Sequence, residues 1–188
     1  MNVIEEINPH INARNVDLDN EIDGRRGFAV TLYAVRLLLV AMWLGAAIFF
    51  GATVAPNAFA VLTASRELAG AIVSRTLAVV NMSGFVISLL LLLSAPVLRR
   101  AGRKAMYRAE MIALAIVATA TGIGQWIITA RLEQLRVAIQ RPVETVAAND
   151  PLRITFGQWH VYSVIALGVA VLSALAAFFL IALRKVDS

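Results

Sequence analysis

The sequence contains no cysteine and only two histidines, and these absences exclude several kinds of site. Without cysteine the chain has no disulfide bond, no thiolate zinc site and no cysteine-ligated iron–sulfur cluster. The histidines, His10 and His160, lie on opposite sides of the membrane in the topology predicted below, so they cannot both bind one haem within a single chain. There is no serine–histidine–carboxylate set and no phosphate-binding loop, since the glycines of "GIGQW" lie inside an apolar run. We therefore expect no catalytic residue, no metal site and no cofactor.

Charge is also scarce, at 15% of the residues, and it is clustered. Hydrophobic residues make up 60% of the chain, against about 45–50% in a soluble domain. No charged residue occurs in 37–65, 76–98, 111–130 or 154–183. Each run has the roughly 20 residues that a helix needs to cross about 30 Å of hydrocarbon, and none alternates like a barrel strand. The sequence predicts an all-α integral membrane four-helix bundle with up-down topology.

The expected organisation is an acidic N-terminal segment, residues 1–26, followed by one transmembrane domain, residues 27–184. We expect the membrane helices at about 28–55, 74–98, 106–131 and 157–183, with an external segment at 131–157.

Prolines mark several of the expected boundaries. Pro56 should end or kink the first helix, and residues 57–75 should form a short interfacial helix that merges into the second. The third helix should continue beyond the membrane and stop before Pro142. Asp150 followed by Pro151 is a cap with a first-turn proline, so the fourth helix should begin outside the hydrocarbon.

Basic residues predict the orientation. The connector "RRAGRKAMYR" at 99–108 shares a side with both chain ends, where Arg25, Arg26, Arg184 and Lys185 flank the helices. The positive-inside rule places these segments in the cytoplasm. The net charge of +5 mostly reflects this orientation and attraction to anionic lipid. No basic stripe with interleaved aromatics occurs elsewhere, so no nucleic-acid partner is expected.

The N-terminal segment has the opposite charge. Residues 1–24 contain six acidic residues and one basic residue, Arg14, with scattered isoleucine and valine. Two interpretations are open: a solvated tail, which the composition favours, or an arm that docks on a partner.

Small residues suggest where helices meet. The first helix places five of them within about 160° of arc, and the third repeats the pattern with two glycines. Such residues let helix backbones approach closely in lipid. The predicted packing residues are Ala41, Gly45, Ala47, Gly51, Ala55, Gly122 and Gly124.

Arg36 and Glu110 are charges near the cytoplasmic ends of two membrane helices. A charge inside a membrane helix is costly and marks a candidate site. The two residues could form an intramembrane pair, or Arg36 could instead extend towards the headgroups by itself.

A second polar group lies in the outer half of the membrane: Asn81, Gln125, His160 and Ser163. A bundle could gather these residues into an outward-facing polar pocket. The alternative is hydrogen bonding between helices together with an interfacial belt of Trp126, Trp159 and Tyr162.

Three stretches carry a resemblance to a known family. They are "WLGAAIFFGATVAPNAFAVL" with "AGAIVSR", the helix end "RLEQLR", and "RITFGQWHVYSV", in which Phe156, His160 and Ser163 match. The likeness spans residues 34–183, over which the chain resembles a bacterial membrane family of unknown function, related to the eukaryotic transmembrane protein 205-like group. The resemblance implies a multi-pass protein of a bacterial cytoplasmic (inner) membrane. The resemblance implies a four-helix membrane protein and brings no reaction or catalytic residues.

Two classes of function follow, with a redox enzyme as a weaker third. The first is a non-catalytic accessory or scaffold subunit of a larger membrane complex, which the sequence favours. The alternative is a small oligomeric transporter or permease, with the outer polar group as its vestibule. The expected partners are the lipid bilayer and either another membrane protein or further copies of the chain.

Overall fold

The computed structural model of the chain describes residues 9–98 and 104–183, and every regular element in those ranges is helical. Four continuous helices are long and apolar enough to cross a membrane, so the prediction of an all-α protein with four spans is confirmed. The segments η1 and η3 are π-helical, whereas η2 and η4 are 3-10 turns. In chain order the elements are α1 (Pro9–Phe49), η1 (Phe50–Val54), α2 (Ala55–Val61), α3 (Arg66–Ser94), η2 (Ala95–Leu98), α4 (Lys104–Gly122), η3 (Ile123–Ile128), α5 (Thr129–Ile139), η4 (Val143–Thr145) and α6 (Pro151–Ala182).

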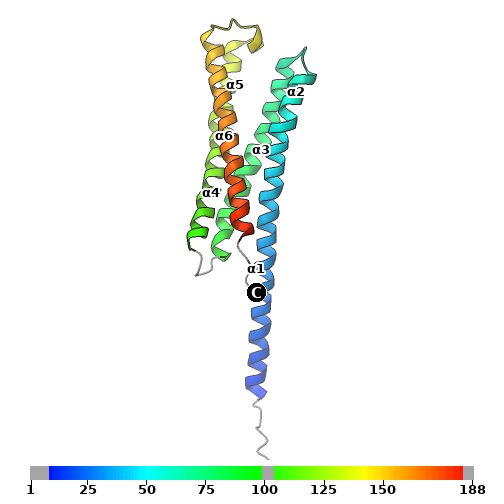
Figure 1. Ribbon diagram of the computed structural model, residues 1–188, viewed down its shortest axis with the longest axis vertical. Helices are drawn as coiled ribbons and strands as arrows, with labels where there is room; N and C mark the ends of the chain where they lie inside the picture. Colours follow the sequence, from blue (N-terminus) through cyan, green and yellow to red (C-terminus); the bar gives the residue numbers. More distant parts are fainter. Residues whose placement is uncertain (1–8, 99–103, 184–188) are drawn as a thin grey trace, which may run out of the picture.

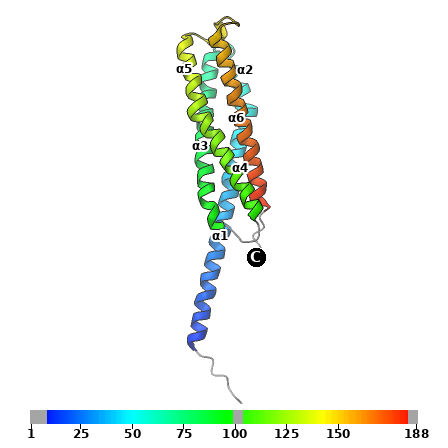
Figure 2. The ribbon, with the colours of Figure 1, turned by 90° about the vertical axis from the view of Figure 1, so that its left-hand side faces the viewer.

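The four spans run up and down beside one another (Figure 1). α1 packs against α3 and α6, and α4 packs against the same two helices from the other side. At one end α1 projects beyond the bundle, and both views show this projection standing apart from the other helices (Figures 1 and 2). We call this the arm end, and the opposite end, which holds the α2–α3 turn and the α5–α6 connection, the hairpin end. Of the predicted orienting charges, Arg99, Arg100, Arg103, Arg184 and Lys185 lie outside the described residues.

The first span does not end at Ala55, and Pro56 does not break it. The helix passes through η1 and continues as α2 to Val61. Pro56 sits in the first turn of α2, where bonding changes from i+5 to i+4 and one carbonyl is skipped. A missing N–H at that change costs little, because no regular partner is lost.

The predicted interfacial helix at 57–75 is also wrong. Residues 57–61 complete α2, the chain turns at 62–65, and α3 begins at Arg66. The turn is tight, with the Leu62 N–H bonded to the Ala58 carbonyl and the Ser65 N–H to the Leu62 carbonyl. The first two spans therefore form a hairpin with no separate helix between them.

The other boundaries follow the proline signals. The third span continues through η3 and α5 to Ile139, and Gln140 ends it in the left-handed conformation at φ 55°, before Pro142. α6 starts at Pro151, and an oxygen of Asp150 accepts a hydrogen bond from the Leu152 N–H at 2.8 Å. This cap is the one that the Asp150–Pro151 pair predicts.

The core is filled by side chains from all four spans, and α6 contributes mainly alanine. Ala170, Ala174 and Ala177 are at most 2% exposed, so α6 approaches its neighbours closely. The outer surface carries large apolar side chains, among them Val79, Leu93 and Leu172, as expected for contact with lipid. The protein is thus an integral membrane protein whose polar chemistry is confined to a few positions.

Candidate functional site

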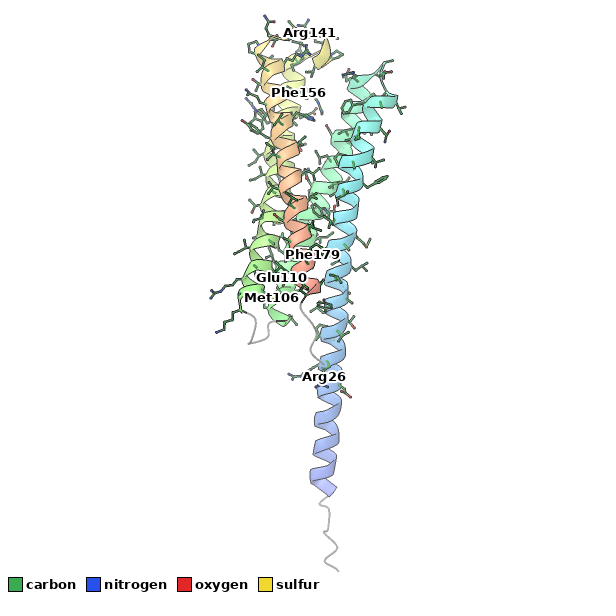
Figure 3. All side chains as sticks on the ribbon, in the orientation of Figure 1. Arg26, Met106, Glu110, Arg141, Phe156 and Phe179 are labelled. Carbon is green, nitrogen blue, oxygen red and sulfur yellow. The ribbon has the colours of Figure 1, made fainter. Side chains whose placement is uncertain are left out.

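Arg36 and Glu110 form the predicted pair. The Nη2 atom of Arg36 donates to Oε1 of Glu110 at 2.6 Å, and the two residues are 1% and 0% exposed. Figure 3 places Glu110 towards the arm end of the bundle, well above Arg26 on α1. Arg36 therefore lies in the core and does not extend along the surface towards the headgroups.

The same guanidinium also holds the end of α3. Its Nη1 atom donates to the carbonyl of Leu91 at 2.5 Å and to the hydroxyl of Ser94. Both partners belong to the last turn of α3, where carbonyls begin to lack helical N–H partners and carry partial negative charge. One cation from α1 thus contacts both α3 and α4. Of the two alternatives that the sequence left open for Arg36, the structure shows the pair with Glu110.

Little space remains near this pair. A cavity of about 10 Å³, lined by Trp43, Gly84 and Leu91 among others, lies in the core beside α3. A volume of this size is at the lower limit for one water molecule. The arrangement therefore fits a structural connection between helices better than a binding site for a substrate.

The four outer polar residues are not brought together. Asn81 is buried on α3, and Gln125 lies in the π-segment η3, but His160 is on the exposed surface of α6. Ser163 is half-buried on α6. His160 is exposed whereas Asn81 is buried, so the two do not share one buried pocket.

Asn81 and Gln125 still have notable surroundings. A Cβ atom built on Gly124 would be 2.9 Å from Nδ2 of Asn81, so this side chain rests on the backbone of η3. The Oε1 atom of Gln125 is buried and has no hydrogen-bond partner within the described ranges. The Thr129 hydroxyl donates to the Gly124 carbonyl at 2.8 Å, in addition to the bond that this carbonyl accepts from the Thr129 backbone N–H.

The predicted packing residues divide into two sets. Ala47 is buried, and Gly122 and Gly124 lie against Phe85 and Asn81, so these three positions lie at contacts between helices. Ala55 is half-buried.

The remaining three packing predictions are wrong for contacts within this chain. Ala41, Gly45 and Gly51 are exposed, and a Cβ atom at either glycine would meet nothing within 4 Å. The inward face of α1 consists instead of Val40, Trp43 and Leu44, together with Ala47.

The sequence reasoning missed a close contact between α1 and α3. A Cβ atom on Gly84 would be 2.6 Å from the indole of Trp43, and the Trp43 Nε1–H donates to the Val80 carbonyl at 2.9 Å. Only a residue without a side chain leaves room for this indole. A signal existed, because a glycine in mid-helix costs about 1 kcal/mol and usually has a packing reason.

A second arginine was also missed, at the hairpin end. The Nη2 atom of Arg136 on α5 donates to the Ser74 hydroxyl on α3 at 2.7 Å, and its guanidinium lies 5.7 Å from the centre of the Phe156 ring on α6. Glu133, one turn earlier, accepts a longer bond of 3.4 Å. Ser74, Arg136 and Phe156 come from the three separate stretches that carry the family resemblance, so those stretches meet at this point.

Comparison with known protein families gives a match. Residues 38–141 match a family described as a domain of unknown function (DUF4149). This range includes Ser74, Glu110 and Arg136, but it begins after Arg36 and ends before Phe156. No curated protein and no solved structure matches the chain. Within the ranges that the structure describes, no three histidine, aspartate or glutamate side chains lie close enough to hold a metal ion.

Proposed function

The chain belongs to the family described as a domain of unknown function (DUF4149), and we propose that it is a non-catalytic accessory or scaffold subunit of a larger membrane complex. The observation that supports this role is the arm. α1 has 41 residues, about twice the number needed to cross the hydrocarbon. Its N-terminal part extends past the other helices as a regular helix (Figure 1).

The sequence of the arm points to the kind of partner. Asp17, Asp19, Glu21 and Asp23 stand against the lone Arg14 in residues 9–24. The anionic surface of a cytoplasmic leaflet would repel this segment, so the arm is suited to a basic protein surface that extends away from the membrane. The projecting part of α1 stands apart from the other described helices, so it does not contribute to the packing of the bundle (Figures 1 and 2).

The exposed positions on α1 support docking as well. Ala41, Gly45 and Gly51 do not serve the bundle of this chain, and small residues on a lipid-facing surface permit close approach of another helix. The partner would then contact α1 both inside and outside the membrane.

The alternative is a small oligomeric transporter. Its support is the buried Oε1 of Gln125, an acceptor that a second chain or a polar solute could satisfy. A relation of this family to the transmembrane protein 205-like group is likewise proposed only on the sequence resemblance.

The proposed role requires the arm to be in the cytoplasm of a bacterial cell, as the basic flanks predict. A reporter that is active only in the cytoplasm should be active when fused after Ser188. The same reporter inserted at Ala147, in the α5–α6 connection, should be inactive. The reverse pattern would place the arm outside the cell and would exclude a cytoplasmic partner.

Neutralising the arm should release the partner. The variant with Asp17, Asp19 and Asp23 changed to Asn and Glu21 to Gln should retain about tenfold less of a co-purifying subunit in mild detergent than the wild type. Raising the salt to about 0.5 M should weaken the wild-type complex too, because the contact is electrostatic. The matched control is Glu67→Gln, which removes an exposed acid at the hairpin end.

Two results would count against a scaffold. Equal recovery of the same subunit by the neutralised variant would reject the arm as its docking site. Purification of the wild type only as copies of itself would favour the oligomeric transporter.

A further inference from the structure

The hairpin end contains a groove that none of the preceding arguments uses. It has a volume of about 620 Å³ and lies between the start of α3 and the segment that contains η4. This volume is within the range of about 300–1,000 Å³ that is typical of small-molecule sites. Its polar lining comes from Thr63, Ser65, Arg66, Glu67 and Thr145.

Arg136 lies next to this groove. Its Nη2 atom is 3.8 Å from the Cβ position of Gly70, a residue of α3 between Leu68 and Ala71, both of which line the groove. The side chain is 31% exposed, unlike the fully buried Arg36. A cation at this position is therefore accessible from the hairpin end.

The guanidinium is held in place but is not saturated. Ser74 orients Nη2, and Phe156 lies 5.7 Å from its carbon. A guanidinium has five N–H donors, and the bonds to Ser74 and Glu133 use two of them among the residues that the structure describes. The other three remain available in a fixed, planar arrangement, which is the geometry that matches phosphate oxygens.

The depth of Arg136 suits the same ligand. The charge-free run of the third span ends at residue 130, and Arg136 follows about 9 Å further along the helix. The headgroup layer on each side of the hydrocarbon is about 5–8 Å thick. The backbone of Arg136 is thus just outside this layer, but its guanidinium bonds to Ser74, which is only about 3 Å along α3 from the charge-free run that begins at residue 76. The guanidinium therefore lies near the level of the lipid phosphates.

We propose that Arg136 binds a phosphate group at the margin of this groove, with Arg66, which lines the groove, as a second cation. The phosphate could belong to a lipid headgroup or to a soluble phosphate ester, since both present the same oxygens. Glu67 also lines the groove, so the two arginines must outweigh its negative charge. The site is independent of the proposed scaffold role, because it lies at the end opposite the arm.

The test uses the full chain in phosphatidylcholine nanodiscs. One arm of the experiment adds phosphatidylglycerol to the bilayer, and the other adds soluble glycerol phosphate. Thermal unfolding is followed by tryptophan fluorescence, and retained lipid is counted by native mass spectrometry. We expect a higher Tm with at least one of the two additions, and about a tenfold loss of apparent affinity in Arg136→Gln.

Two further variants separate binding from folding. Arg141→Gln, which removes an exposed arginine at the same end, should bind like the wild type. Ser74→Ala removes the bond that orients Arg136 but keeps the charge, so most of the binding should remain. The proposal fails if neither addition raises the Tm, if Arg141→Gln loses as much affinity as Arg136→Gln, or if Ser74→Ala loses all binding. A response to phosphatidylglycerol alone identifies the lipid as the source of the phosphate, and a response to glycerol phosphate identifies the soluble ester.

Discussion

Replacing either Arg36 or Glu110 with leucine is expected to lower the free energy of unfolding in detergent by about 3–5 kcal/mol. The reason is that the remaining charge stays buried without its partner. The double variant should lose less than the sum of the two single losses, because no uncompensated charge is left. Thermal or denaturant unfolding of all three variants in one detergent measures this coupling.

Tyr33→Phe is the matched control for this cycle. The Tyr33 hydroxyl donates to the carbonyls of Ile181 and Ala182, so it also joins α1 to a helix end near the arm end of the bundle, but without charge. Its loss should cost about 1 kcal/mol. Additive losses for Arg36 and Glu110 would contradict the coupling that the 2.6 Å contact implies.

The second large effect is expected at Gly84. A leucine there cannot coexist with the Trp43 indole, which lies 2.6 Å from the Cβ position, so α1 and α3 would have to separate. We expect a loss of more than about 3 kcal/mol, or failure to fold. Gly84→Ala alone should also lose stability. Adding Trp43→Leu should recover part of that loss, because the smaller leucine leaves room for the new methyl group.

Gly51→Leu distinguishes overpacking from the general cost of changing a helical glycine. Nothing lies within 4 Å of its Cβ position, so the variant should keep the stability of the wild-type chain to within about 0.5 kcal/mol in detergent. A loss similar to that of Gly84→Leu would mean that Gly51 contacts another chain even in the purified protein. Circular dichroism melting curves of the two variants give the comparison.

The ion pair could be predicted because a charged side chain in an apolar environment needs an oppositely charged partner or a route to the headgroups. Arg36 and Glu110 enter the membrane from the same side in any up-down topology of these spans, and each needs a partner. The partners on α3 could not be predicted in the same way. Every residue has a backbone carbonyl, so the sequence does not single out that of Leu91. Only the packing of α3 against α1 places this carbonyl within reach of Arg36.

The sequence could not predict which face of α1 packs in the core, because lipid and the protein core are both apolar. In water the apolar side of a helix identifies its core, but in a membrane both sides are apolar. The small residues Gly45 and Gly51 therefore looked like a packing face, while the true face is centred on Trp43. The π-segments add a local shift of phase, since each inserts a residue into the helical repeat around Phe50 and Gln125.

The polar pocket failed for a related reason. Residues at the same depth need not share one environment, since His160 is exposed whereas Asn81 is buried. By contrast, the contact between Arg136 and Phe156 joins two of the stretches that carry the family resemblance, "RLEQLR" and "RITFGQWHVYSV". The sequence did not predict which side of α5 faces its neighbours. In the structure Arg136 is on the side that faces α3 and α6.

The triple contact of Arg36 also bears on the order in which the protein is assembled during synthesis. Arg36 precedes Glu110 by 74 residues, a delay of about 4–15 s at ribosomal rates of about 5–20 residues per second. During that interval the first helix carries an arginine whose insertion costs up to about 3 kcal/mol. The neutral partners on α3, Leu91 and Ser94, emerge first and can shield the guanidinium, but they cannot balance its charge. The carboxylate arrives only when α4 is inserted. The first two spans therefore reach their final arrangement only after the third span is in the membrane.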